Sequence, residues 1–209
     1  YDVVVIDNLS AGNALLVPND VPLVVGEVGD QALIHNILIR YKVSSVMHFA
    51  GSIVVSESLH DPLKYYANNT DSSRRLLESC HNYGIQNFVF SSTAAVYGNP
   101  TENPVCEETA LAPINPYGAS KMMFERILSD TANISDMHFA ILRYFNVSGA
   151  DPSGRSGQLG KNSTHLIRVS TEVALGKRDG MSVYGTDYQT PDGTCIRDFI
   201  HVSDLADAH

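Results

Sequence analysis

The sequence predicts an α/β protein built on a doubly wound parallel sheet, with helices on both faces and right-handed crossovers. Short runs of β-branched and other apolar residues recur along the chain, as is typical of strands buried in a parallel sheet. Most of these runs are followed by a segment in which apolar residues have helical spacing. Polar or small residues stand where the runs end, and the carboxyl ends of parallel strands are where such sheets bind ligands.

Strands are expected at residues 3–6, 22–25, 45–49, 87–91 and 138–143. Helices are expected between them, at residues 30–41, 57–83 and 116–132, because apolar residues recur there three and four positions apart. The long helical segment is expected to restart at Asp61-Pro62, since proline suits the first turn of a helix. This alternation of strands and helices is the basis of the fold prediction.

The sequence changes character after Asn146. Residues 149–163 are polar and rich in glycine and serine, which predicts a long flexible loop of the kind that is usually functional. A helix is expected at 166–175, strands at 181–184 and 197–202, and a last helix capped by Ser203. We therefore expect one domain over 1–148 and an incomplete second one over 149–209, with strand 197–202 returning to the first. Both ends suggest a fragment, because Tyr1 leads directly into a strand and the last helix is short.

Composition excludes several classes of partner. The chain has 209 residues, 44% of them hydrophobic, and a net charge of −9, which nucleic acids and acidic membranes would repel. Cys80, Cys106 and Cys195 are far apart and odd in number, which predicts reduced thiols in a cytoplasmic protein rather than disulfides or a metal site. No apolar run is long enough to span a membrane.

A candidate site lies at the start of the helix expected at 116–132. Asn115 can cap the first N–H groups of this helix, and Pro116 suits its first position. Tyr117 then falls in the first turn, with Lys121 one turn further along the same face. A nearby ammonium and the positive end of the helix dipole both favour a phenolate, so Tyr117 could act as a general base. The alternative is an accidental pair of surface residues.

Three strand ends supply further candidates. Asp7 could cap a loop, or it could accept both hydroxyls of an adenosine ribose and so select NAD over NADP. The glycine-rich loop that accompanies such an acid would then precede Tyr1. His48 could be a catalytic base, but a histidine inside an apolar strand is more often a core residue. The hydroxyls of residues 91–93 could cap loop amides or hydrogen-bond a substrate hydroxyl.

Together these motifs resemble those of the extended short-chain dehydrogenases/reductases, and the resemblance covers essentially the whole chain. The shared motifs are Asp7-Asn8, Phe49-Ala50-Gly51, Ser91-Ser92-Thr93 before Val96-Tyr97-Gly98, Tyr117-x-x-x-Lys121 and Arg143-Tyr144-Phe145-Asn146. The most specific part is the run from Tyr184 to Val202, with Pro191-Asp192-Gly193-Thr194 and Arg197-Asp198. This run is similar to that of the UDP-glucose 4-epimerases, also called UDP-galactose 4-epimerases.

The resemblance implies a Rossmann-like, NAD-binding domain over 1–148 and part of a smaller substrate-binding domain over 149–209. It implies an isomerase of galactose metabolism that epimerises UDP-glucose and UDP-galactose at C4 through a transient 4-keto sugar, with NAD as cofactor. Tyr117, Lys121 and Thr93 would be catalytic, Tyr117 as base and acid, and Thr93 as a partner of the sugar O4. The family pairs through helices equivalent to those near 65–80 and 117–132, which implies a homodimer.

The resemblance also assigns binding residues, and no metal. The NAD site would comprise Asp7, Asn8, Glu27, Val28, Phe49, Ala50, Gly51, Asn68, Tyr117, Lys121 and Phe145. The UDP-sugar site would comprise Thr93, Tyr117, Asn146, His165, Leu166, Tyr184 and Arg197, the last as a cation for the diphosphate. The chain departs from the family at Glu27, where aspartate is usual, at Ile53, often a lysine, and at His165, where some members carry asparagine.

Two alternatives are weighed against an epimerase. A nucleotide-sugar dehydratase on the same scaffold typically needs an Asp-Glu pair beside the strand-end hydroxyl, whereas Thr93 is followed by Ala94-Ala95. A non-catalytic NAD(P)-sensing protein would not need intact Thr93, Tyr117 and Lys121. We therefore expect an enzyme, and we expect these 209 residues alone to be inactive.

Overall fold

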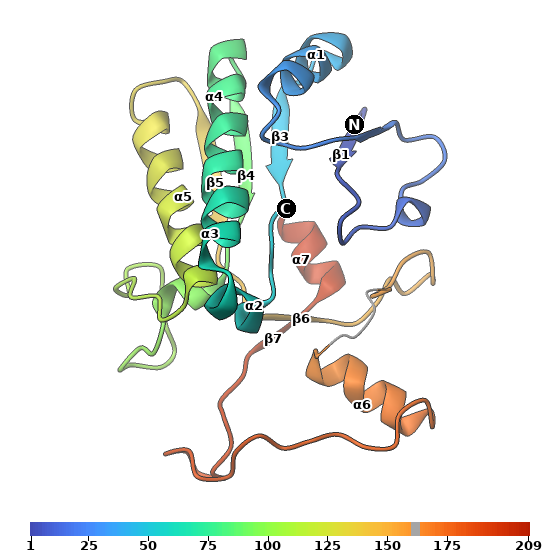
Figure 1. Cartoon of the computed structure of the whole chain (residues 1–209), viewed down its shortest axis with the longest axis vertical. Coiled ribbons are helices and arrows are strands. Elements are labelled where there is room, and N and C mark those ends of the chain that lie inside the picture. The colour runs from blue at the N-terminus through green and yellow to red at the C-terminus, as the bar shows by residue number, and fades with distance from the viewer. Residues whose placement is uncertain (160–163) are drawn as a thin grey trace. The chain divides into compact units, whose positions relative to one another are not determined.

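The computed structural model describes residues 1–159 and 164–209, which form two compact units, Tyr1–Arg143 and Tyr144–His209 (Figure 1). The first unit ends at Arg143, a little before the domain boundary expected at residue 148.

The strands of the first unit form two parallel sheets. β1 (Val5–Asp7) pairs with β2 (Leu23–Val25), and β4 (Asn87–Ser91) pairs on one side with β3 (Ser45–His48) and on the other with β5 (His138–Leu142). All of these strands lie within one or two residues of the ranges expected from the sequence. The parallel α/β architecture is as predicted.

The helices of the first unit begin and end where local chemistry dictates. Asp30 caps α1 (Gln31–Tyr41) by accepting a hydrogen bond from the Leu33 N–H at 3.1 Å, and Lys42 ends this helix in a left-handed conformation. α4 (Ser73–Tyr83) ends at Gly84, whose φ of 88° suits glycine. α5 (Pro116–Ala132) is the longest helix of this unit.

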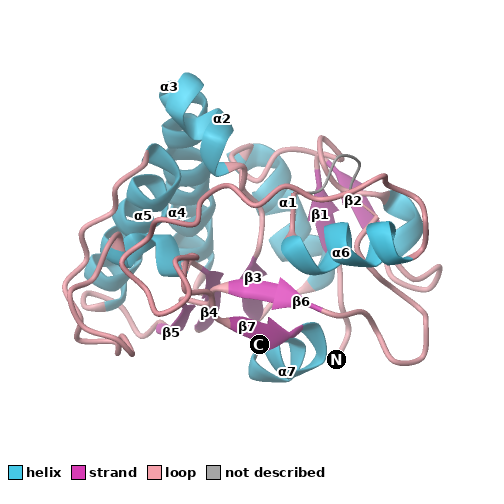
Figure 2. Ribbon diagram, turned by 90° about the horizontal axis from the view of Figure 1, so that it is seen from below, coloured by secondary structure: helices cyan, strands magenta, loops and turns pink. Residues whose placement is uncertain are grey.

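Helices α1, α4 and α5 lie on one side of the β3–β4–β5 sheet (Figure 2). Their apolar side chains and those of the strands form the larger of two buried hydrophobic clusters. Its members include Ile34, Leu38, Leu76, Leu77, Phe88, Phe90, Phe124 and Leu128. Helices were expected on both faces of the sheet. In this unit, however, Met47 on β3 and Phe139 on β5 remain exposed. The runs of apolar residues predicted the strands correctly, but they did not show what covers the second face of the sheet.

The segment over 57–83, expected to be helical with a restart at Asp61-Pro62, is divided into four. α2 (Val55–His60) is followed by α3 (Pro62–Tyr65), which Asp61 caps through the Lys64 N–H at 3.2 Å. The restart predicted at Asp61-Pro62 is therefore confirmed. The turn after it was not predicted: η2 (Tyr66–Ser72) is π-helical, a wider form of helix often found at functional sites, and it continues into α4.

Short 3₁₀ turns complete the first unit. η1 (Ala14–Leu16) is capped by Asn13, and η3 (Ala94–Tyr97) follows β4 after two residues.

None of the described helices has the length and apolarity needed to cross a membrane. Within residues 1–159 and 164–209, no three His, Cys, Asp or Glu side chains are grouped so that they could hold a metal ion.

In its described residues, the second unit contains one parallel pair of strands and two helices. β6 (Asn146–Ser148) pairs with β7 (Phe199–His201), and the helices are α6 (Leu166–Ala174) and α7 (Val202–Ala208). The expected strand 197–202 is thus confirmed in a shorter form, with Ile200 opposite Val147. Its return to the first domain stays a prediction.

Three local predictions in the second unit need correction or restriction. Residues 181–184 form no strand, because they have no ladder partner, and Tyr184 is almost fully exposed. Ser203 does not cap the last helix; its N–H donates instead to the His201 ring Nδ1 at 3.2 Å. The loop expected over 149–163 is free of helix and strand in its described part, 149–159, and residues 160–163 lie outside the described residues.

Candidate active site

The start of α5 is built as the sequence predicts. The Asn115 side chain accepts a hydrogen bond from the Gly118 N–H at 2.8 Å, and Pro116 occupies the first helical position. Gly118 lets this end of the helix approach the segment after β4, because a Cβ atom there would stand only 2.5 Å from the Ala95 carbonyl oxygen. Tyr117 is therefore held beside the loop that carries Thr93.

Lys121, one turn further along α5, is buried and faces the end of β4. Its Nζ donates to the Ser91 carbonyl oxygen at 3.0 Å and lies 4.9 Å from the centre of the Phe90 ring. Burial lowers the pKa of Lys121 to about 8, and the Glu125 carboxylate partly opposes this by favouring the ammonium. The bond to Ser91 uses one of the three ammonium hydrogens, so others can serve a ligand.

Thr93 is nearly buried and caps the 3₁₀ turn η3. Its Oγ1 accepts a hydrogen bond from the Ala95 N–H at 3.2 Å. The hydroxyl thus has the capping role weighed in the sequence analysis, and its own hydrogen can still be donated. The contacts of Lys121 with Ser91 and of Gly118 with Ala95 bring the three predicted catalytic residues to one end of β4.

The segment after β3 lies close to Lys121. A Cβ atom at Gly51 would stand 3.2 Å from the Lys121 Nζ and 3.0 Å from the Asn69 Oδ1, so this backbone passes very near both. Asn69 accepts from the Ser52 N–H at 2.7 Å and donates to the Ser52 carbonyl at 3.0 Å. Asn68 donates to the Ser52 hydroxyl at 2.9 Å. The π-helical turn η2 thereby fixes the Gly51–Ser52 backbone against α5.

Asp7, Asn8 and Glu27 gather at the ends of β1 and β2. The Asn8 Nδ2 donates to the Glu27 Oε1 at 3.0 Å. The Asp7 Oδ1 accepts from the Leu9 N–H at 2.6 Å, which matches the loop-capping alternative for this aspartate. The neighbouring Val28 is buried in the core, so its side chain packs there.

Phe49, which is exposed, and Ala50, which packs against the core, follow β3 in the first unit. The other predicted residues belong to the second unit, and their joint role stays a prediction. Asn146 donates to the Asp198 carbonyl at 2.9 Å, and the Arg197 Nε lies 3.3 Å from the Cys195 Sγ. Tyr184 is exposed, as are Phe145 and Leu166. His165 precedes the first turn of α6.

Sequence reasoning missed several residues that support the site. Tyr65 is fully buried, packs edge-on to Tyr117 with ring centroids 6.4 Å apart, and donates to the Glu57 Oε2 at 2.9 Å. Asn69 and Glu125 were given no role either. Two signals could have found them, since Asn69 is a polar residue in an amphipathic helical segment and Glu125 lies one turn beyond Lys121.

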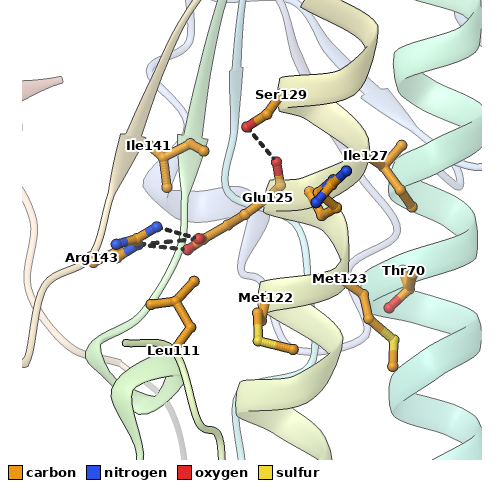
Figure 3. A pocket seen from close by; sticks show the side chains of 10 residues that line it. Thr70, Leu111, Met122, Met123, Glu125, Ile127, Ser129, Ile141 and Arg143 are labelled. Atoms are coloured by element: carbon orange, nitrogen blue, oxygen red, sulfur yellow. Dashed lines mark hydrogen bonds and ion pairs between the residues drawn. The ribbon is translucent and has the colours of Figure 1, made fainter. Parts of the chain in front are cut away.

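A cavity of about 650 Å³ lies alongside α5 and β5 (Figure 3). It is lined mainly by apolar side chains together with the Glu125–Arg143 pair. Its lining residues are Thr70, Leu111, Met122, Met123, Glu125, Arg126, Ile127, Ser129, Ile141 and Arg143. Neither Tyr117 nor Thr93 lines this cavity, so it is distinct from the candidate site.

Comparison with known proteins places this architecture in a family. The model of the NAD dependent epimerase/dehydratase family matches residues 1–209. The chain belongs to this family. The predicted resemblance is thereby confirmed, and the motifs at the ends of β1, β3 and β4 and at the start of α5 are those of a member of the NAD dependent epimerase/dehydratase family.

Similar members of this family are UDP-glucose 4-epimerases. The enzyme of Azospirillum brasilense is 55% identical over 99% of this chain and 59% of its own length. The Brucella ovis enzyme in complex with NAD is 46% identical, with a TM-score of 0.93 over 99% of this chain and 63% of its own. The Bifidobacterium longum enzyme, in complex with NAD⁺ and UDP, is 38% identical, with a TM-score of 0.93 over 100% of this chain and 65% of its own. The chain thus spans about three-fifths of the length of the curated relatives it matches.

Proposed function

We propose that this protein is an isomerase that interconverts UDP-glucose and UDP-galactose at sugar C4, with NAD as cofactor. The observation that carries the proposal is the convergence of Tyr117, Lys121 and Thr93 at the end of β4. It is supported by relatives named as UDP-glucose 4-epimerases that share 55% and 46% of their aligned residues with this chain.

The residues present fit a dinucleotide. Lys121 keeps ammonium hydrogens available beside the glycine backbone of residue 51, and a larger residue there would crowd it. Asp7, Asn8 and Glu27 offer a carboxylate, an amide and a second carboxylate at the ends of two parallel strands, as the hydroxyls of an adenosine ribose require. Asn68, Phe49 and Ala50 would border the middle of the cofactor.

The chain's own residues would move and hold the proton of the sugar O4. Tyr117, as a phenolate favoured by the Lys121 charge and by the start of α5, would accept this proton and later return it. Thr93 would hold O4 by a hydrogen bond, and Lys121 would hold the nicotinamide ribose. When bound, NAD supplies reversible hydride acceptance, so the net reaction is an isomerisation.

The second unit would supply the contacts to the rest of the substrate. We assign the NAD site to a domain over 1–148, including Val28 and Phe145, and the UDP-sugar site to residues of 149–209 together with Asn146. Arg197 would pair with the diphosphate, since a guanidinium binds phosphate oxygens well. His165, Leu166 and Tyr184 would meet the nucleotide and sugar.

We also infer the setting of the enzyme. Galactose metabolism in the cytoplasm follows from the proposed substrates and from the reduced thiols predicted for the three cysteines. A homodimer is supported by the exposed apolar side chains near α5, among them Met123 and Ile114.

Replacing Tyr117 by phenylalanine tests the function. Tyr117→Phe in the full-length protein removes the proton acceptor and keeps the ring, so turnover of UDP-galactose should fall by about 10²–10⁴-fold while NAD stays bound. Turnover is measured by NMR of the sugar anomeric protons, and NAD by its release on denaturation. The matched control is Tyr83→Phe at the end of α4, which should keep full turnover. Unchanged turnover in Tyr117→Phe would remove this residue from the mechanism.

A further inference from the structure

We propose that Glu125 and Arg143 form a positioning pair that aligns the catalytic residues: Glu125 supports the Lys121 charge and, through Ser92, fixes the end of β4 that carries Thr93. This inference rests on the proposed function and concerns residues that touch neither the substrate nor the cofactor. It assigns a role to an ion pair that the sequence motifs left unexplained.

Glu125 is buried, Arg143 is partly buried, and several hydrogen bonds join them (Figure 3). Glu125 is only 3% exposed, and its Oε2 accepts from the Arg143 Nη2 at 2.8 Å and from the Arg143 Nε at 3.1 Å. Its Oε1 accepts from the Arg143 Nε at 3.1 Å and from the Ser92 hydroxyl. Both oxygens of this carboxylate therefore accept hydrogen bonds from Arg143, and Oε1 also accepts one from Ser92.

Arg143, which directly follows β5, is fixed from its other side. Its Nη1 donates to the Tyr97 hydroxyl at 3.1 Å and to the Glu107 carbonyl at 3.2 Å, and the guanidinium lies 5.4 Å from the centre of the Tyr97 ring. The pair thus joins β5, the turn η3 and α5. A buried ion pair is often no more stabilising than apolar residues of the same volume, so stability alone does not account for it.

Glu125 influences the candidate site in two ways, through its charge and through a hydrogen bond. It lies one turn beyond Lys121 on α5, where its negative charge favours the Lys121 ammonium against the effect of burial. It also binds Ser92, which stands between Ser91, the acceptor of the Lys121 hydrogen bond, and Thr93. One carboxylate therefore controls both a charge and a backbone position in the site.

The other titratable groups around Lys121 leave this role to Glu125. His48, on β3, has its pKa lowered to about 3, chiefly by burial, so it is neutral at working pH. Tyr65, on α3, has its pKa raised by burial and stays protonated. Tyr117 is the proposed proton acceptor itself, and Arg143 is the cation that offsets Glu125.

Two substitutions with opposite electrostatic effects test the pair in the full-length protein with NAD bound. Glu125→Gln removes a charge that favours the Lys121 ammonium, so the pKa of Lys121 should fall and the alkaline limb of the kcat profile should move to lower pH. We expect the loss of kcat to be about fivefold greater at pH 8.5 than at pH 6.5. Arg143→Met removes the offsetting cation, so the limb should move to higher pH.

A direct titration of Lys121 gives a readout that does not depend on activity. The ¹³Cε signal of Lys121, assigned by its absence in Lys121→Met, should titrate at lower pH in Glu125→Gln and at higher pH in Arg143→Met. The matched control is Asp130→Asn, a charge removed from an exposed ion pair on the same helix, which should leave the titration unchanged.

The outcomes separate this inference from the proposed function. A uniform loss of kcat with an unmoved limb, or shifts of the same sign in both variants, would show a purely structural ion pair and overturn the proposal. If Glu125→Gln does not fold, the upward shift in Arg143→Met alone decides the matter. An unmodified protein without epimerase activity, but with Lys121 titrating as expected in the variants, would refute the function and not the electrostatic pairing.

Discussion

His48 shows how a polar residue becomes part of a core. It is 3% exposed on β3, and its Nε2 lies 2.7 Å from the Ser73 hydroxyl. Its ring packs against Phe88, Phe90 and Phe124, with centroids about 6 Å away. Of the two interpretations weighed from the sequence, a catalytic base or a core residue, the structure confirms the second.

This burial predicts a pH dependence of stability. Because the pKa of His48 falls from 6.5 to about 3 on folding, protons bind the unfolded chain more readily than the folded one. The contribution of His48 is complete above pH 6.5 and is lost as the pH falls from there toward 3, with a slope of up to about 1.4 kcal/mol per pH unit. Urea unfolding of the full-length protein at pH 7.5 and pH 5 measures it.

The control for this prediction is another histidine. His48→Leu should show a smaller loss of unfolding free energy between pH 7.5 and pH 5 than the unmodified protein. His35→Gln, at an exposed position on α1, should keep the full loss. Equal pH dependence in His48→Leu and the unmodified protein would contradict the assignment of this histidine as neutral and buried.

At the scale of the element, the turn η2 holds the segment after β3 against helix α5 through hydrogen bonds. Asn69 is 1% exposed and uses its amide on the Ser52 N–H, the Ser52 carbonyl and the Ser120 hydroxyl, the last at 3.1 Å. Asn69→Ala would leave these groups without their partner, which should lower the unfolding free energy by about 2 kcal/mol or more and weaken retention of NAD.

The neighbouring asparagine is the comparison for that experiment. Asn68→Ala removes a single bond, to the Ser52 hydroxyl, and should lower the unfolding free energy by about 1 kcal/mol. Urea unfolding and the NAD content of the purified protein are measured for both variants. Similar stability losses in the two would mean that the π-helical turn does not hold the Gly51–Ser52 backbone as its contacts indicate.

The elements also show which features local sequence could predict. Asn115 caps α5 as expected, and Asp30 and Asp61 cap helices where helix starts were expected, because a cap depends on residues only two or three positions apart. β6 was missed and residues 181–184 were wrongly expected to form a strand, since a strand exists only where a distant segment offers a ladder. The π-helical turn likewise left no local signature.

The same distinction holds for the site. Tyr117, Lys121 and Thr93 could be found because their motifs are local, and contacts at the end of β4 bring them together. Glu125 has one local signal, its place one turn beyond Lys121, but its role with Arg143 depends on tertiary contacts. These are the ion pair between α5 and the residue after β5, and the hydrogen bond that the Ser92 hydroxyl donates to Glu125. Motifs therefore identified the groups proposed for chemistry, whereas tertiary contacts identified those proposed to align them.

At the scale of the whole molecule, the exposed apolar side chains on α5 provide a test of the proposed dimer. Met123 is 42% exposed there and lines the cavity beside Met122 and Ile127. If two copies pair through this face, as we propose, Met123→Glu would place a charge in an apolar contact that excludes water, at a large cost in free energy. The full-length protein should then change from two protomers to one in sedimentation equilibrium.

A methionine of similar exposure provides the matched control for this dimer prediction. Met181 is 47% exposed in the second unit, away from α4 and α5 in sequence, so Met181→Glu should keep the mass of two protomers. Because an isologous interface presents the same residue from both copies, Met123→Glu should also act with doubled effect, bringing two carboxylates into the contact. Dissociation in Met181→Glu but not in Met123→Glu would place the interface on the second unit. A single-protomer mass for the unmodified protein would show that the α5 face serves something other than self-association.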